Sequence, residues 1–161
     1  MVSNEAKEIS QVFQTFKKLG GITFNYNSKR GYTSSQSGWV DHVIIWKRVM
    51  YLVEVKLGKD QLSEEQALLG KKVYDDLNYE VQYYIITSVD QAREFMNLVL
   101  ELVEDGEDRD YINSAVQSQL FIYQNRTESF IREALERIDK KRKLVQEDKS
   151  NANNNRKQSN S

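Results

Sequence analysis

A glutamate and a lysine stand two residues apart inside a hydrophobic segment, MYLVEVKL, at residues 50–57. Side chains in a β-strand alternate between the two faces of the sheet, so Glu54 and Lys56 are expected on the same face. A second apolar segment, WVDHVIIW at residues 39–46, contains Asp41, which shares a face with Val43 and Ile45. If the two segments pair, Asp41 can come close to Glu54 and Lys56.

Two carboxylates and one amine on a largely apolar sheet leave one negative charge over. Ionised groups that are partly buried cost several kcal/mol each unless they are paired. A divalent cation would resolve this excess, and Mg²⁺ typically takes one or two carboxylates together with waters and phosphate oxygens. Lys56 could then hold a metal-bound water for attack on an anionic substrate. These residue types therefore favour metal-assisted hydrolysis at a phosphate.

The segments that must position this cluster follow a helix, three strands, helix, strand, helix order. Residues 39–46 and 50–57 predict an antiparallel hairpin, and the strand–helix–strand step after it predicts a right-handed crossover with parallel strands. The fold class predicted is α/β, a mixed sheet flanked by helices. The helices are expected at residues 4–19, 63–77 and 89–103, and the remaining strands at 22–26 and 81–87.

An acidic stretch, EDGEDRD at residues 104–110, indicates a boundary. We therefore predict a catalytic domain over residues 1–104 and a helical extension over 105–147. In the extension Ile131, Leu135, Ile138 and Val145 form an apolar seam, which could pack on the same chain or on a partner subunit. Residues 148–161 are polar and of low complexity, and we expect a disordered tail.

Composition narrows the class of protein further. The chain has 161 residues, no cysteine and a net charge of −1, so disulfides and thiolate zinc sites are excluded. Residues 74–110 contain eleven acidic and two basic residues, whereas residues 137–161 contain eight basic and three acidic ones. Basic segments of this kind can contact phosphate backbones. With no signal sequence or apolar span in view, we expect a cytoplasmic protein without a membrane partner.

Three sequence elements in order resemble the PD-(D/E)XK nuclease superfamily, and in particular its virus-type replication–repair nuclease (VRR-NUC) branch. That branch has G-x-P-D, then E-V-K, then L-S-x-x-Q; this chain has GWVD at 38–41, EVK at 54–56 and LSEEQ at 62–66. The resemblance covers about residues 5–100. Val40 stands where the family usually has proline, which leaves the expected metal ligands intact.

The resemblance implies a restriction-endonuclease-like fold and Mg²⁺- or Mn²⁺-dependent hydrolysis of DNA in replication, recombination or repair, in a phage-encoded protein acting in the host cytoplasm. It implies that Asp41, Glu54 and the carbonyl of Val55 are the metal ligands, with Lys56 catalytic. It also makes Gln66 an active-site neighbour, although Ser63 and Gln66 equally fit a helix capping box. We predict the site role for Gln66.

Members of the fold often supply a glutamate from the first helix, and Glu5 and Glu8 compete for that place. By resemblance to the family, the spacing to the glycine after the helix favours Glu8, and we predict it as a site residue. The single histidine, His42, is interpreted as structural. Lys29 and Arg30 in the loop before Asp41 are candidate DNA contacts.

Two strands can be cut symmetrically only by two such sites, so a homodimer is expected. The substrate is expected to be DNA, including branched or flapped DNA. A Holliday-junction resolvase is the alternative enzyme, because such enzymes share the fold. A non-catalytic DNA-binding or protein-interaction factor is the alternative of another class, and metal titration separates it from the enzymes.

Overall fold

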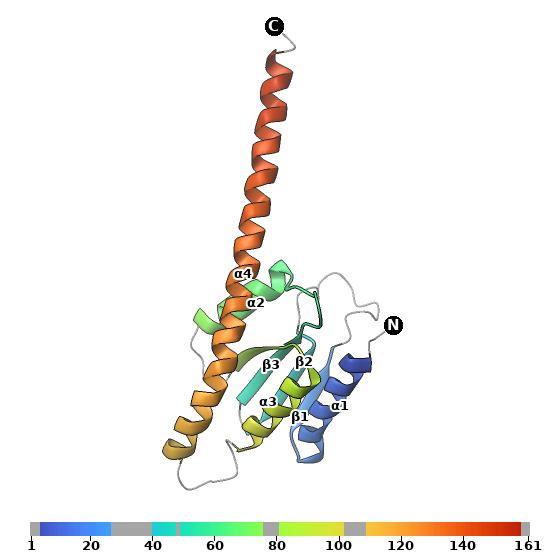
Figure 1. The fold of residues 1–161 in the computed structure, drawn as a ribbon, viewed down its shortest axis with the longest axis vertical. Coiled ribbons are helices and arrows are strands. Elements are labelled where there is room, and N and C mark those ends of the chain that lie inside the picture. Colours follow the sequence, from blue (N-terminus) through green and yellow to red (C-terminus); the bar gives the residue numbers. More distant parts are fainter. Residues whose placement is uncertain (1–3, 27–39, 48, 76–80, 102–108, 159–161) are drawn as a thin grey trace.

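The computed structural model describes residues 4–26, 40–47, 49–75, 81–101 and 109–158, and in the last helix the side chains of residues 118 and 120–149. The strands form one sheet with helices packed around it, as Figure 1 shows. In chain order they are α1 (Asn4–Lys18), β1 (Ile22–Asn25), β2 (His42–Trp46), β3 (Val49–Val55), α2 (Glu64–Asp75), β4 (Val81–Ile86), α3 (Val89–Glu101) and α4 (Arg109–Gln158).

The strands form a mixed sheet in the order β1-β2-β3-β4. β1 with β2 and β2 with β3 are antiparallel, whereas β3 and β4 are parallel with α2 between them in the chain. The predicted hairpin, the parallel step and the α/β class are therefore confirmed. Ser88 caps α3, since its Oγ accepts a hydrogen bond from the Gln91 amide at 3.2 Å.

Each face of the sheet has its own hydrophobic core. Helices α1 and α3 pack on one face, where Phe13 and Phe95 meet Tyr51 and Val53 of β3. On the other face α2 and α4 cover Leu52. The alternation within β3 directs successive side chains to opposite cores. Full burial of side chains of this size contributes roughly 1.5–3 kcal/mol each, so both layers stabilise the strand that carries Glu54.

Helix α4 packs closely on α2 at Gly70. A Cβ atom at that position would lie 2.6 Å from Cδ1 of Ile131, so glycine allows the two helices to approach. Ile131 is buried and Leu135 packs against the same core, whereas Val145 is exposed. The first half of the predicted seam therefore belongs to the chain's own core, and only its far end is free for other contacts.

Beyond this contact α4 continues well away from the body of the protein (Figure 1). It remains helical to Gln158, whereas the sequence predicted a disordered tail from Asp148, so that prediction was wrong for the backbone of residues 148–158. Extending an existing helix needs no new nucleus. The chain also contains no proline, and its last glycine is Gly106, so nothing after Arg109 interrupts the helix. None of the described helices is long and apolar enough to cross a membrane.

Candidate active site

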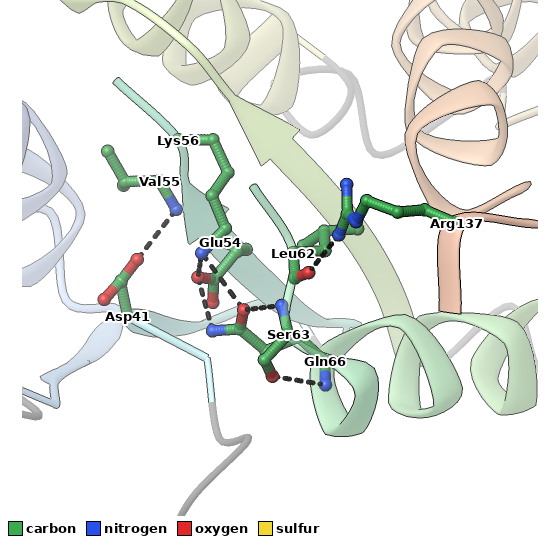
Figure 2. A network of polar contacts seen from close by, with 8 residues as sticks. All are labelled: Asp41, Glu54, Val55, Lys56, Leu62, Ser63, Gln66 and Arg137. Carbon is green, nitrogen blue, oxygen red and sulfur yellow. Dashed lines mark hydrogen bonds and ion pairs between the residues drawn. The ribbon is translucent and has the colours of Figure 1, made fainter. Parts of the chain in front are cut away.

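Glu54 and Lys56 lie together at the end of β3, on the face covered by α2 (Figure 2). Lys56 Nζ is 2.6 Å from Glu54 Oε1. The Glu54 side chain is 1% exposed and that of Lys56 11% exposed, so the ion pair is almost completely shielded from water. The Lys56 amide donates to the carbonyl of Ile86 in β4 at 2.9 Å, which fixes the backbone where the parallel pair ends. The prediction that the two side chains share a face is confirmed.

Asp41 joins this pair from the neighbouring strand. Its Oδ2 accepts a hydrogen bond from the Val55 amide at 2.9 Å, so its carboxylate is attached to the residue between Glu54 and Lys56. The strand was predicted to begin before Asp41, but β2 begins at His42, which leaves Asp41 in a bend just ahead of it. The two carboxylates predicted from the strand pattern are nevertheless brought together.

Gln66 performs two roles that the sequence presented as alternatives. At the start of α2 its amide donates to Ser63 Oγ at 3.2 Å, and its Oε1 accepts from the Ser63 amide at 3.0 Å, which is a complete capping box. The same Oε1 accepts from Lys56 Nζ at 3.0 Å, and Nε2 donates to Glu54 Oε1 at 2.6 Å. One side chain can do both, because the carboxamide has a separate donor and an oxygen with two lone pairs.

The electrostatics of the cluster leave an unbalanced negative charge. The pKa of Glu54 is raised to about 7, mainly by burial and in addition by the nearby Asp41 carboxylate, and Lys56 only partly opposes these two effects. Glu54 Oε2 is also buried without a hydrogen-bond partner. A buried, unpartnered carboxylate oxygen facing a second carboxylate fits a bound cation, which would satisfy the oxygen and neutralise the excess charge.

The cluster contains only two carboxylates. Across the described ranges, no group of three or more histidine, cysteine, aspartate or glutamate side chains could hold a metal ion. A cation here would therefore depend on Asp41, Glu54 and backbone or water oxygens, a donor set that suits Mg²⁺ or Mn²⁺ better than zinc.

Glu8 does not join the cluster. Helix α1 packs on the sheet face opposite to Glu54, and Glu8 is half-exposed and forms an ion pair with Arg93 of α3. The prediction that Glu8 supplies a site carboxylate was therefore wrong. Spacing along α1 indicated which residues share a helix face, but the side of the sheet to which α1 packs decides what that face meets. Glu5 is exposed on the same helix.

His42 is buried beneath α1, and its ring lies edge-on to Phe13 with centroids 5.1 Å apart. Burial lowers the pKa of His42 to about 4, although Asp41 opposes this shift. A histidine that stays neutral inside a core agrees with the structural interpretation. The predicted DNA contacts Lys29 and Arg30 lie outside the described residues.

Arg137 of α4 is a residue that the sequence did not single out. Its guanidinium donates to the carbonyl of Leu62 at 2.8 Å, directly before the Ser63 cap (Figure 2). The contact holds the loop that presents Gln66 to the site. No sequence signal could have indicated it, because 75 residues separate the partners.

Comparison of this chain with protein-family models, with curated proteins and with solved structures gives no match.

Proposed function

We propose that this protein is a Mg²⁺- or Mn²⁺-dependent PD-(D/E)XK endonuclease that hydrolyses phosphodiester bonds in DNA. One observation carries the proposal: Asp41, Glu54 and Lys56 meet at the end of β3, with one oxygen of Glu54 buried and unpartnered. Buried carboxylates with excess negative charge are costly unless a cation binds them. The mixed sheet flanked by helices agrees with the restriction-endonuclease-like fold that the motif resemblance implies.

Asp41 and Glu54 would hold the metal, and the carbonyl of Val55, the residue directly after Glu54, would join them. A divalent cation at such a site activates water and stabilises negative charge on the phosphate in the transition state. The two carboxylates supply hard oxygen donors at a partly buried position, which suits a cation that keeps several bound waters.

Lys56 would position the attacking water or the phosphate. An ammonium group has three N–H donors, and two of those on Lys56 are directed to Glu54 and Gln66. The third remains for a water or a phosphate oxygen. Gln66 orients this group, because its carboxamide bonds to both members of the ion pair and is itself held by Ser63.

A DNA substrate is supported by the charges near the site. Arg142 of α4 forms an ion pair with Glu64 at the start of α2, which places the basic run 140–143 close to the helix that carries Gln66. Lys140, Lys141 and Lys143 are exposed and have no ion-pair partner among the described residues. Such a run can neutralise backbone phosphates next to the cut.

The test is cleavage of end-labelled linear, flapped, nicked and four-way DNA with Mg²⁺ or Mn²⁺. We expect cleavage by the wild type and none by Asp41→Asn or Lys56→Ala, with melting temperatures showing that both variants fold. Lys71→Ala and Asp75→Asn are matched controls, because they disrupt an exposed ion pair on α2 away from the site. Both should cut at the wild-type rate.

The same panel separates the rivals. A resolvase would prefer the four-way substrate, and cutting in two symmetric strands would follow. A non-catalytic binding factor would retain DNA in a mobility-shift gel without cutting it and would show no Asp41-dependent metal binding in a calorimetric titration. Cleavage that persists in Asp41→Asn would place the active site elsewhere.

A further inference from the structure

Edge strand β1 exposes apolar side chains on the same sheet face as Glu54. Ile22 is 51% exposed, Phe24 46% and Tyr26, directly after the strand, 40%. These residues alternate with Thr23 and Asn25, so they share one face. Helices α2 and α4 bury Val43 and Leu52 of the adjoining strands on this face but leave the β1 side chains uncovered, whereas α1 contacts β1 from the other side.

The backbone pairing places Tyr26 directly beside Asp41, one of the proposed metal ligands. The Tyr26 amide donates to the Asp41 carbonyl at 2.8 Å, which continues the β1–β2 pairing by one residue. Asp41 directly precedes the His42–Val53 pair of β2 and β3, and its carboxylate accepts a hydrogen bond from the Val55 amide, next to Glu54. Residues directly opposite one another in antiparallel strands have Cα atoms about 4.5–5.5 Å apart. Tyr26 therefore lies beside Asp41, whose carboxylate reaches the end of the strand that carries Glu54.

Phe24 lies one row further along β1, opposite Val43. The rings of Phe24 and Tyr26 have centroids 6.3 Å apart and planes inclined by 35°. Two solvent-accessible rings thus stand next to each other, one strand away from Asp41. Exposed large aromatic side chains gathered at one place commonly mark a binding surface.

We propose that Phe24 and Tyr26 form a stacking site for unpaired bases of single-stranded DNA that leads away from the scissile phosphate. The inference rests on the proposed nuclease function, because that function places a phosphate at Asp41 and Glu54. Every base presents an aromatic face to such rings, but bases in a duplex stack on one another and conceal those faces. The position of the two rings favours this ligand over a second protein copy, because Tyr26 directly adjoins Asp41 of the proposed metal site.

The direct test measures binding of a single strand of about 12 nucleotides and of the matching duplex, in EDTA so that no cleavage occurs. The double variant Phe24→Leu/Tyr26→Leu removes both rings and keeps apolar side chains. We expect it to bind the single strand about tenfold more weakly or worse, with less than about a twofold change for the duplex. Tyr26→Phe keeps the ring and should bind as the wild type does. Ile22→Ser alters an equally exposed neighbour outside the aromatic pair and serves as the matched control.

A strand with abasic sites keeps its phosphates but offers no bases to stack. The wild type should bind it more weakly than the intact strand, and the double variant should not distinguish the two. Equal affinity of wild type and double variant for the intact single strand overturns the proposal, as does a wild type that binds neither strand. A change from dimer to monomer in the double variant, measured by light scattering, also overturns it, because a second copy would then occupy the rings. Since binding is measured without metal, loss of cleavage in Asp41→Asn tests the nuclease function separately.

Discussion

The side chain of Gln66 joins the cap of α2 to the Glu54–Lys56 ion pair. Its carboxamide oxygen accepts hydrogen bonds from the Ser63 amide and from Lys56 Nζ, and its carboxamide nitrogen donates one to Glu54. The start of α2 and the Glu54–Lys56 pair therefore share one anchor. Any movement of this helix end would alter the orientation of Lys56.

Replacing Gln66 should consequently affect two quantities together. We expect Gln66→Ala to lose roughly 0.5–2 kcal/mol of unfolding free energy through the helix cap and also to cut DNA more slowly, because Lys56 loses its orienting partner. Ser63→Ala is the matched control, since it removes the bond from the Gln66 amide to Ser63 Oγ and keeps the bond from the Ser63 amide to Gln66 Oε1. It should destabilise the protein while leaving turnover almost unchanged. Wild-type cleavage by a destabilised Gln66→Ala would limit Gln66 to capping.

Glu54 should make stability depend on pH when metal is absent. Its pKa is about 7 in the folded protein, above the ordinary value of 4.5, so the folded state retains a proton that the unfolded chain releases between these values. The stabilising contribution of Glu54 is therefore complete below pH 4.5 and is lost as pH rises through 7. The free energy of unfolding changes by about 3 kcal/mol between these limits. The Glu54→Gln variant does not lose stability in this way, because glutamine does not titrate. Its stability relative to wild type should rise between about pH 5 and pH 8, measured by urea unfolding in EDTA.

His42 acts in the opposite direction, because its lowered pKa makes stability rise with pH between about 4 and 6.5. It is present in both proteins, so the comparison with Glu54→Gln cancels it. Adding Mg²⁺ at the higher pH should stabilise the wild type and reduce the advantage of the variant. A difference that stays constant with pH would contradict the electrostatic account of the site.

At the scale of elements, α4 is one helix with two environments. Its middle packs on α2 at Gly70, and Thr127 accepts a hydrogen bond from the Ile85 amide of β4 at 3.1 Å. From Asp139 to Lys149 its side chains are exposed. One part of the helix therefore packs on the body of the protein, and the other part is exposed to solvent.

Truncation after Glu147 should leave folding intact. The helix continues to Gln158, but residues 148–161 contain one apolar side chain, Ala152, and can contribute little burial. We expect the melting temperature to change very little. Ile131→Ala is the contrasting variant, because it opens a cavity beside Gly70 and should cost about 2–5 kcal/mol. A truncated protein that aggregates or melts far below the wild type would show that the end of α4 has a folding role.

At the scale of the whole molecule, α4 supplies the surface through which two chains could pair. Leu144 and Val145 are exposed on its projecting half, whereas Leu135 is packed in the chain's own core. A homodimer through this half would bring together two active sites that each cut one strand, as symmetric cleavage requires. The basic run 140–143 would then lie beside the DNA.

We expect the wild type to scatter light as a dimer at micromolar concentration and the double variant Leu144→Glu/Val145→Glu to be a folded monomer. Lys149→Glu is the matched control, since it introduces the same charge on the same exposed half of the helix and should remain dimeric. Leu135→Glu would be a poor test, because a charge in the core destabilises the fold itself. A monomeric wild type would contradict the dimer prediction, and each chain would then cut one strand with its single active site.

The sequence by itself determined the features that depend on local periodicity. The alternation in β3 placed Glu54 and Lys56 on one face, the spacing of Ser63 and Gln66 specified a cap, and a helix between β3 and β4 required a parallel pair. Each follows from geometry within one element or one connection. These relations hold whatever the rest of the chain does.

Only the tertiary structure decided which faces meet. It turned Glu8 toward Arg93 instead of the site, assigned Ile131 to the core, and brought Arg137 to the loop before α2. It also brought Tyr26 beside Asp41, and the Asp41 carboxylate to the Val55 amide next to Glu54. Spacing along a chain fixes the direction of a side chain within its own helix or strand. What that side chain contacts depends on packing between elements, which local periodicity does not encode.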